Sequence, residues 1–143
     1  MPRLVELTNS GLSSNIYVHP EGDFISDIIA HQHDFYENTY LKEFYKILKF
    51  NQIGDPGIFI DVGCNIGNHS LYLNTMINFQ NMVLIDISEK NCILASLNNP
   101  NAVVINSAAS DINGSGEVYL YDDNSGVGTV KSLWENDPGW GKK

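Results

Sequence analysis

Basic residues are scarce in this chain of 143 residues, which has eight lysines and arginines against 17 aspartates and glutamates and a formal net charge of −9. We find no basic cluster apart from the terminal pair Lys142-Lys143. A protein that binds nucleic acid normally neutralises several phosphates with clustered lysine and arginine side chains. Nucleic acid is therefore not expected as a substrate or partner.

Long apolar runs are also lacking, and the chain has only two cysteines. No segment approaches the roughly 20 apolar residues of a membrane span, and the first residues do not resemble a signal peptide. Cys64 and Cys92 form no C-x-x-C pair, so neither a disulfide framework nor a zinc site is indicated. We therefore expect a cytoplasmic protein with no membrane partner, folded as a single domain over residues 1–143.

The most informative segment that is present covers residues 58–68. It opens with the run Ile58-Phe59-Ile60, which is typical of a strand buried on both faces. Gly63 and Gly67 then allow the backbone to turn tightly against a ligand. Asn65 stands between them and is one of the few non-glycine types that tolerate left-handed backbone angles. The segment therefore predicts a nucleotide-binding turn between a strand and a helix.

Spacing and charge favour one class of nucleotide over another. A dinucleotide site is typically marked by G-x-G-x-x-G, whereas this turn reads G-x-N-x-G with Asn68 after it. Asp61 precedes the first glycine by two residues, where it would repel a pyrophosphate and attract an ammonium group. S-adenosylmethionine carries an ammonium group and no phosphate, so it is favoured over a nicotinamide cofactor. Asp86 follows about 20 residues later, the offset at which a carboxylate accepts hydrogen bonds from ribose hydroxyls in either ligand.

The segment 58–73 (I-F-I-D-V-G-C-N-I-G-N-H-S-L-Y-L), together with Tyr36-Glu37 and N-S-A-A-S-D at 106–111, resembles the FkbM-type S-adenosylmethionine-dependent methyltransferases. The resemblance extends from about Asp23 to Leu133. It implies that the methionine end of the cofactor lies at the glycine turn, the ribose at Asp86 and the adenine at Ser107-Ala108. The implied cofactor-binding residues are Glu37, Asp61, Gly63, Asn65, Gly67, Asn68, Asp86, Ile87, Ser107 and Ala108. This chain departs from the family in having Asp86-Ile87 where Glu-Pro is usual.

Periodicity predicts the elements around this turn. A helix is expected over 36–50, with Leu41, Phe44, Tyr45 and Leu48 on one apolar face and a break at 54–57. Further helices are expected over 68–79, capped by Asn68, and to about Asn98 after an N-cap at Ser88. Strands are expected at 58–62, 82–87, 102–105 and, as a half-buried antiparallel strand after a turn at 113–114, at 117–121.

This order predicts an α/β fold with a doubly wound, Rossmann-like sheet of the class I methyltransferase type. Residues 1–57 would form an N-terminal extension and helix, 58–111 the cofactor-binding βαβαβ half, and 112–143 a hairpin and tail. The first strand would lie at the centre, with later strands stepping outward. Family members continue through further strands, so the chain is expected to be truncated after its third parallel strand, with the outer edge of 58–62 open.

Catalytic residues are less clearly marked. Transfer of a methyl group to a hydroxyl mainly requires positioning, helped by a base within reach of the hydroxyl proton. His69 is the candidate base; the alternative is a helix-start residue that hydrogen-bonds the turn. Glu37 is either a cofactor contact or an ordinary helix-start residue. The run 31–34 (H-Q-H-D) contains two histidines with metal-ligand chemistry but no third ligand, so a solvated turn is favoured and no metal is expected.

The sequence therefore predicts a methyltransferase that uses S-adenosylmethionine and acts on a hydroxyl of a small molecule or sugar. The first alternative is a non-catalytic or degenerate S-adenosylmethionine-binding subunit that needs a partner chain. The second is a nicotinamide-dependent enzyme, which the glycine spacing disfavours. In either of the first two cases we expect a second copy or a complementary C-terminal half to cover the open edge of 58–62.

Overall fold

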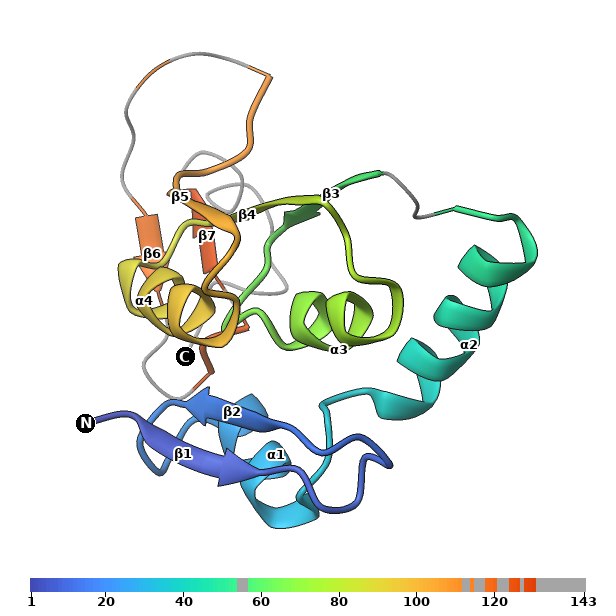
Figure 1. The fold of residues 1–143 in the computed structure, drawn as a ribbon. Helices are drawn as coiled ribbons and strands as arrows, with labels where there is room; N and C mark the ends of the chain where they lie inside the picture. Colours follow the sequence, from blue (N-terminus) through green and yellow to red (C-terminus); the bar gives the residue numbers. More distant parts are fainter. Residues whose placement is uncertain (54–56, 112–113, 115–117, 121–123, 127, 131–143) are drawn as a thin grey trace, which may run out of the picture.

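The computed structural model describes residues 1–53, 57–111, 114, 118–120, 124–126 and 128–130 (Figure 1). These residues form an α/β protein with one three-stranded parallel sheet and two separate antiparallel hairpins. The predicted break at 54–57 and turn at 113–114 fall partly outside the described residues. None of the described helices has the length and apolar character needed to cross a bilayer.

The parallel sheet follows the predicted strand and helix order. Its strands are β3 (Ile58–Val62), β4 (Asn81–Asp86) and β5 (Val103–Asn106), hydrogen-bonded in the order β3-β4-β5. They are connected by α3 (Asn68–Ile77) and α4 (Glu89–Asn98). Each later strand steps outward from β3, as right-handed crossovers predict. The predicted βαβαβ unit is therefore confirmed, with bounds that differ by one or two residues.

The two faces of this sheet differ sharply. Helices α3 and α4 lie side by side on one face (Figure 1). They share this face because both connections between parallel strands step the same way along the sheet. On the opposite face, Ile58, Ile60 and Val62 of β3 are each more than half exposed, and Val103 and Ile105 of β5, on the other side of β4, are exposed as well. The prediction that β3 is buried on both faces is therefore wrong, because no helix of the described residues covers this second face.

The outer edge of β3 is open as well. Within the described residues β3 pairs only with β4, from Ile58 opposite Asn81 to Val62 opposite Ile85. The opposite edge of β3 therefore has no strand partner in this part of the chain. Such an edge, beside an apolar face, favours pairing with another polypeptide.

The N-terminal region contains more secondary structure than the extension and single helix that the sequence predicted. Strands β1 (Arg3–Glu6) and β2 (Asn15–Val18) form an antiparallel hairpin, followed by α1 (Phe24–Gln32) and α2 (Asn38–Phe50). The hairpin packs against α4 on the side away from the parallel sheet, so that α3 and α4 form a middle layer (Figure 1). The main core lies between these layers and contains Val5, Leu7, Ile16, Val18, Ile29, Phe35, Leu41, Leu48, Ile66, Tyr72, Leu73 and Leu94.

One buried side chain fastens the hairpin to the middle layer. The Asn98 side-chain oxygen accepts from the Tyr17 amide (2.7 Å), and its nitrogen donates to the Tyr17 carbonyl (2.9 Å) and to the Ile66 carbonyl (2.8 Å). Asn98 thus pairs with β2 much as a neighbouring strand would. The backbone amide and carbonyl of Tyr17 are thereby satisfied by a residue 81 positions away in the sequence.

Helix α2 begins two residues later than predicted. Glu37 adopts a left-handed conformation (φ 60°) just before it, so that Tyr36 and Glu37 lie outside the helix. Leu41 and Leu48 are buried as predicted, whereas Phe44 remains 45% exposed. The predicted apolar face is therefore narrower than its spacing suggested.

Helix α3 is capped differently from the prediction. Gly67, at φ 76°, occupies the N-cap position, and Asn68 is the first helical residue. The Asn68 side chain accepts from the Tyr36 amide (3.1 Å) and donates to the Tyr36 carbonyl (3.0 Å). The prediction of Asn68 as N-cap is wrong, because its side chain instead holds the segment before α2 against the glycine turn.

The described part of the C-terminal region forms a second hairpin. Strand β6 (Val118–Leu120) pairs with β7 (Gly128–Val130) in antiparallel fashion. The predicted antiparallel strand is therefore confirmed at 118–120. The prediction that this strand is half-buried is not confirmed, because Val118 and Leu120 are both exposed.

Candidate functional site

A cavity of about 430 Å³ lies at the carboxyl ends of β3, β4 and β5. The turn after β3, the ends of the other two strands and part of the loop between β6 and β7 line it. In open parallel sheets this end of the strands is where ligands bind. The structure brings together at this cavity the following residues predicted from the sequence: Gly63, Asn65, Asn68, His69, Asp86, Ile87, Ser107 and Ala108.

Three predicted cofactor residues do not line the cavity: Glu37, Asp61 and Gly67. Side chains alternate between the two faces of β3, and Asp61 points to the face that the helices cover. There its carboxylate accepts a hydrogen bond from the Ser70 hydroxyl. Glu37 lies beside His69. Gly67 faces α4 rather than the cavity.

The two glycines of the turn serve different purposes. Both have left-handed backbone angles, φ 79° at Gly63 and φ 76° at Gly67. A Cβ at Gly67 would overlap Nδ2 of Asn99 and crowd Cα of Ala95 at 3.3 Å, so this glycine lets the start of α3 pack on α4. A Cβ at Gly63 would meet nothing within 4 Å, so this glycine leaves open space beside the cavity.

Asp86 is the buried carboxylate of the site. The Asn65 amide donates to its Oδ2 (2.8 Å), while the Ser88 amide (2.8 Å) and Nδ2 of Asn91 (3.2 Å) donate to Oδ1. A carboxylate offers roughly four acceptor positions, so these contacts use most of them. A ligand hydroxyl would add a hydrogen bond at Oδ2, on the oxygen that faces the glycine turn.

His69, the second residue of α3, belongs to the cavity wall. Its Nε2 is shielded from solvent and lies 3.3 Å from Oε2 of Glu37, outside hydrogen-bond geometry. The left-handed conformation of Glu37 brings its carboxylate to this position at the start of α2. The pair forms a histidine–carboxylate contact at the edge of the cavity.

The two thiols near the site are buried and neutral. Burial, assisted by the negative charges of Asp86 and Asp61, raises the pKa of the Cys64 thiol. Burial and Asp86 raise the pKa of the Cys92 thiol in the same way. Since the thiolate is the reactive form, neither cysteine is suited to act as a nucleophile at neutral pH.

The histidines of 31–34 are separated by the helix end. His31 lies in the last turn of α1, and His33 adopts a left-handed conformation after it, with Nδ1 3.0 Å from the Glu6 carbonyl. Within the described residues, no group of three or more histidine, cysteine, aspartate or glutamate side chains is arranged to hold a metal ion.

Tyr36, which belongs to the segments that carry the resemblance, also lines the cavity. Several further cavity residues carry no signal in the sequence: Ile25, Leu120, Ser125 and Gly126. They come from α1 and from the β6–β7 hairpin, far from the glycine turn in the chain. Only the tertiary fold brings them to the site.

Comparisons with protein-family models, with curated proteins and with solved structures found no match. The class that the fold itself defines is an α/β protein whose parallel sheet is compatible with part of a Rossmann-like fold.

Proposed function

We propose that this chain is an S-adenosylmethionine-dependent methyltransferase, of the FkbM type that its motif resembles, acting in the cytoplasm on a hydroxyl of a small molecule or sugar. Its sheet would be the cofactor-binding part of a class I methyltransferase-like fold. The observation that carries the proposal is the cavity at the carboxyl ends of three parallel strands, where Gly63, Asn65 and Asp86 meet.

The chemistry of the cavity wall supports a nucleoside ligand without phosphates. No lysine or arginine is among the described residues that line it, and Asp86 contributes a carboxylate. A pyrophosphate would gain no cationic partner here and would be repelled by Asp86. The volume of about 430 Å³ lies in the usual range for small-molecule sites.

The residues divide naturally into roles. Asp86 would accept a hydrogen bond from a ribose hydroxyl, while Ile87 and Ala108 offer apolar contact and Ser107 a hydroxyl on the adenine side. Gly63 leaves room for the ligand. When bound, S-adenosylmethionine supplies a methyl group already activated by the sulfonium, so the chain mainly positions the reactants and excludes water.

His69 is the residue best placed to take a proton from an acceptor hydroxyl, because it is the imidazole that lines the cavity. Glu37 is better suited to holding His69 than to binding the cofactor, since its carboxylate lies 3.3 Å from Nε2 and outside the cavity wall.

The second candidate function is a non-catalytic S-adenosylmethionine-binding subunit. The open edge of β3 and its exposed apolar face favour it, because both would be covered in a complex. In either case we propose that a second copy or a complementary C-terminal half pairs with β3. Light scattering that shows a folded, non-associating monomer would contradict this pairing.

Titration calorimetry of the full chain with S-adenosylhomocysteine and, separately, with NAD tests the proposal. We expect binding of S-adenosylhomocysteine and none of NAD. Binding of NAD alone, or of neither compound, would overturn the proposed function. Transfer of labelled methyl groups to a panel of sugars then separates the enzyme from the binding subunit, because only the enzyme yields labelled product.

A further inference from the structure

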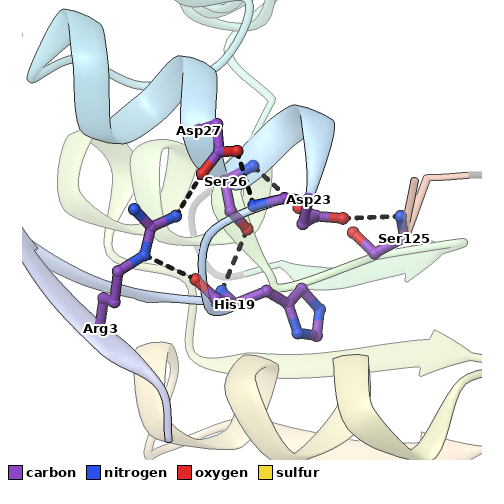
Figure 2. Close-up of polar contacts among 7 residues, drawn as sticks. Arg3, His19, Asp23, Ser26, Asp27 and Ser125 are labelled. Carbon is purple, nitrogen blue, oxygen red and sulfur yellow. Dashed lines mark hydrogen bonds and ion pairs between the residues drawn. The ribbon is translucent and has the colours of Figure 1, made fainter. Parts of the chain in front are cut away.

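Residues 124–126, which we name the Ser125 loop, are fastened to three other parts of the molecule. The Ser125 amide donates to Oδ2 of Asp23 (2.7 Å), which Figure 2 shows. Its Oγ accepts from Nδ2 of Asn65 (3.1 Å), and its carbonyl accepts from Nδ2 of Asn91 (3.0 Å). The amide, the carbonyl and the hydroxyl of Ser125 are therefore each bonded to a different element.

Two of these anchors also hold Asp86. The Asn65 amide and Nδ2 of Asn91 both donate to the Asp86 carboxylate, so Asn65, Asp86, Asn91 and Ser125 form a closed ring of hydrogen bonds. Asn91 is 1% exposed, and its Oδ1 lies 2.8 Å from Nε2 of His19. The ring links the Ser125 loop directly to the Asp86 carboxylate in the cavity wall.

The third anchor, Asp23, is fixed at the start of α1. It is 4% exposed, and its Oδ1 accepts from the Ser26 amide (2.9 Å) as the helix N-cap. Burial raises the pKa of the Asp23 carboxyl, but the hydrogen bonds from Ser26 and Ser125 more than offset this, so the pKa lies below its ordinary value. The bond to the Ser125 amide is therefore charge-assisted at neutral pH.

The surroundings of Asp23 leave it little freedom. The Ser26 hydroxyl accepts from the His19 amide (3.1 Å), and Arg3 donates to the His19 carbonyl (2.9 Å) and to Asp27 (2.5 Å), as Figure 2 shows. These bonds tie the first turn of α1 to the N-terminal hairpin.

The Ser125 loop also packs closely against α1. A Cβ at Gly126 would lie 2.7 Å from Cδ1 of Ile25, and both residues line the cavity. Gly126 therefore allows the loop to approach α1, so that one wall of the cavity is built from two segments about 100 residues apart in the chain.

We propose that Ser125 and Gly126 form a binding wall of the cofactor site and that Asp23 is the positioning residue that holds this wall against the ligand. The identity of the ligand rests on the proposed function. Asp86 belongs to the same hydrogen-bond ring, so binding of a ligand to Asp86 is coupled to anchoring of the loop. Anchoring of the loop raises the affinity for the ligand, and the ligand favours the anchored loop by the same factor.

The test replaces Asp23 by asparagine in the full chain. Asp23→Asn keeps the size of the side chain and an oxygen to cap α1, but it removes the charge that holds the Ser125 amide. We expect about tenfold weaker binding of S-adenosylhomocysteine by calorimetry, the effect of losing one charge-assisted hydrogen bond. Asp27→Asn is the matched control: Asp27 lies in the first turn of the helix that Asp23 caps and bonds Arg3 and Gly22 but not the loop, so affinity should change less than twofold.

Hydrogen exchange gives a second readout that needs no variant. In the unmodified chain, S-adenosylhomocysteine should slow exchange of the Ser125 and Gly126 amides. If the ligand binds and leaves this exchange unchanged, or if Asp23→Asn speeds loop exchange without weakening binding, the inference is overturned while the proposed function stands. Failure of the unmodified chain to bind the ligand overturns the proposed function, and exchange of the loop in Asp23→Asn still reports on the Asp23 anchor.

Discussion

Replacement of Asp86 by alanine is expected to weaken binding of S-adenosylhomocysteine between about tenfold and a hundredfold and to lower the free energy of unfolding by about 2–4 kcal/mol. The loss of affinity follows from removing a charged acceptor for the ribose. The loss of stability follows because donors of Asn65, Ser88 and Asn91 would lose their shared partner. Water entering through the cavity would hydrate some of these donors, which limits the cost.

Two further variants separate these effects. Asp86→Asn keeps the shape and one acceptor oxygen, so its stability should lie between those of the unmodified chain and Asp86→Ala. Asp111→Ala removes an exposed carboxylate that does not line the cavity and should change neither quantity appreciably. Urea denaturation measures stability and calorimetry measures affinity. Unchanged affinity in Asp86→Ala would show that the ribose assignment is wrong.

The βαβαβ unit could be predicted because its signals are local. Short apolar runs mark β3 and β4, and Ser88 caps α4 through the Asn91 amide, as predicted. The N-terminal hairpin could not be predicted in the same way. Its attachment to α4 depends on Asn98 pairing with Tyr17, and no periodicity in either segment reports a contact across 81 residues.

The sequence indicates which segments meet at the cavity where backbone geometry fixes their position, but not where the direction of a side chain matters. The turn and the ends of β4 and β5 meet at one edge of the sheet because parallel strands must end together. Asp61 was expected at the ligand, but strand alternation points it toward α3, where Ser70 binds it. Asn68 was expected to cap α3, but a contact with Tyr36, 32 residues away, uses its side chain.

The place of the Ser125 loop in the cavity wall could not be predicted from the sequence for a similar reason. Residues 124–126 have the composition of an ordinary flexible loop, and the sequence predicts nothing more. Its place in the cavity wall depends on Asp23, 102 residues earlier in the chain. Only the packing of the N-terminal layer against α4 brings the two segments together.

Alanine at Gly67 and at Gly63 should affect stability very differently. Both substitutions place a side chain at a left-handed φ, at a cost of about 1–2 kcal/mol. In Gly67→Ala the new methyl group also pushes Asn99 and the backbone of Ala95 away from residue 67. This adds about 1–3 kcal/mol to the loss of stability. Gly63→Ala meets no neighbour and should show the backbone cost alone. Gly11→Ala, at φ 78° with nothing within 4 Å, is the matched control for that cost in urea denaturation.

Valine at Gly63 should abolish measurable binding of S-adenosylhomocysteine while the chain still folds. The added methyl groups enter the open space that Gly63 leaves at the cavity, where the methionine end of the ligand is expected. Gly11→Val introduces the same side chain at nearly the same φ, away from the cavity, and should retain full affinity. Calorimetry on both variants, after circular dichroism shows that each is folded, decides the matter. If Gly63→Val bound as tightly as Gly11→Val, the ligand would have to lie elsewhere, because no ligand seated against this turn can share its space with a valine side chain.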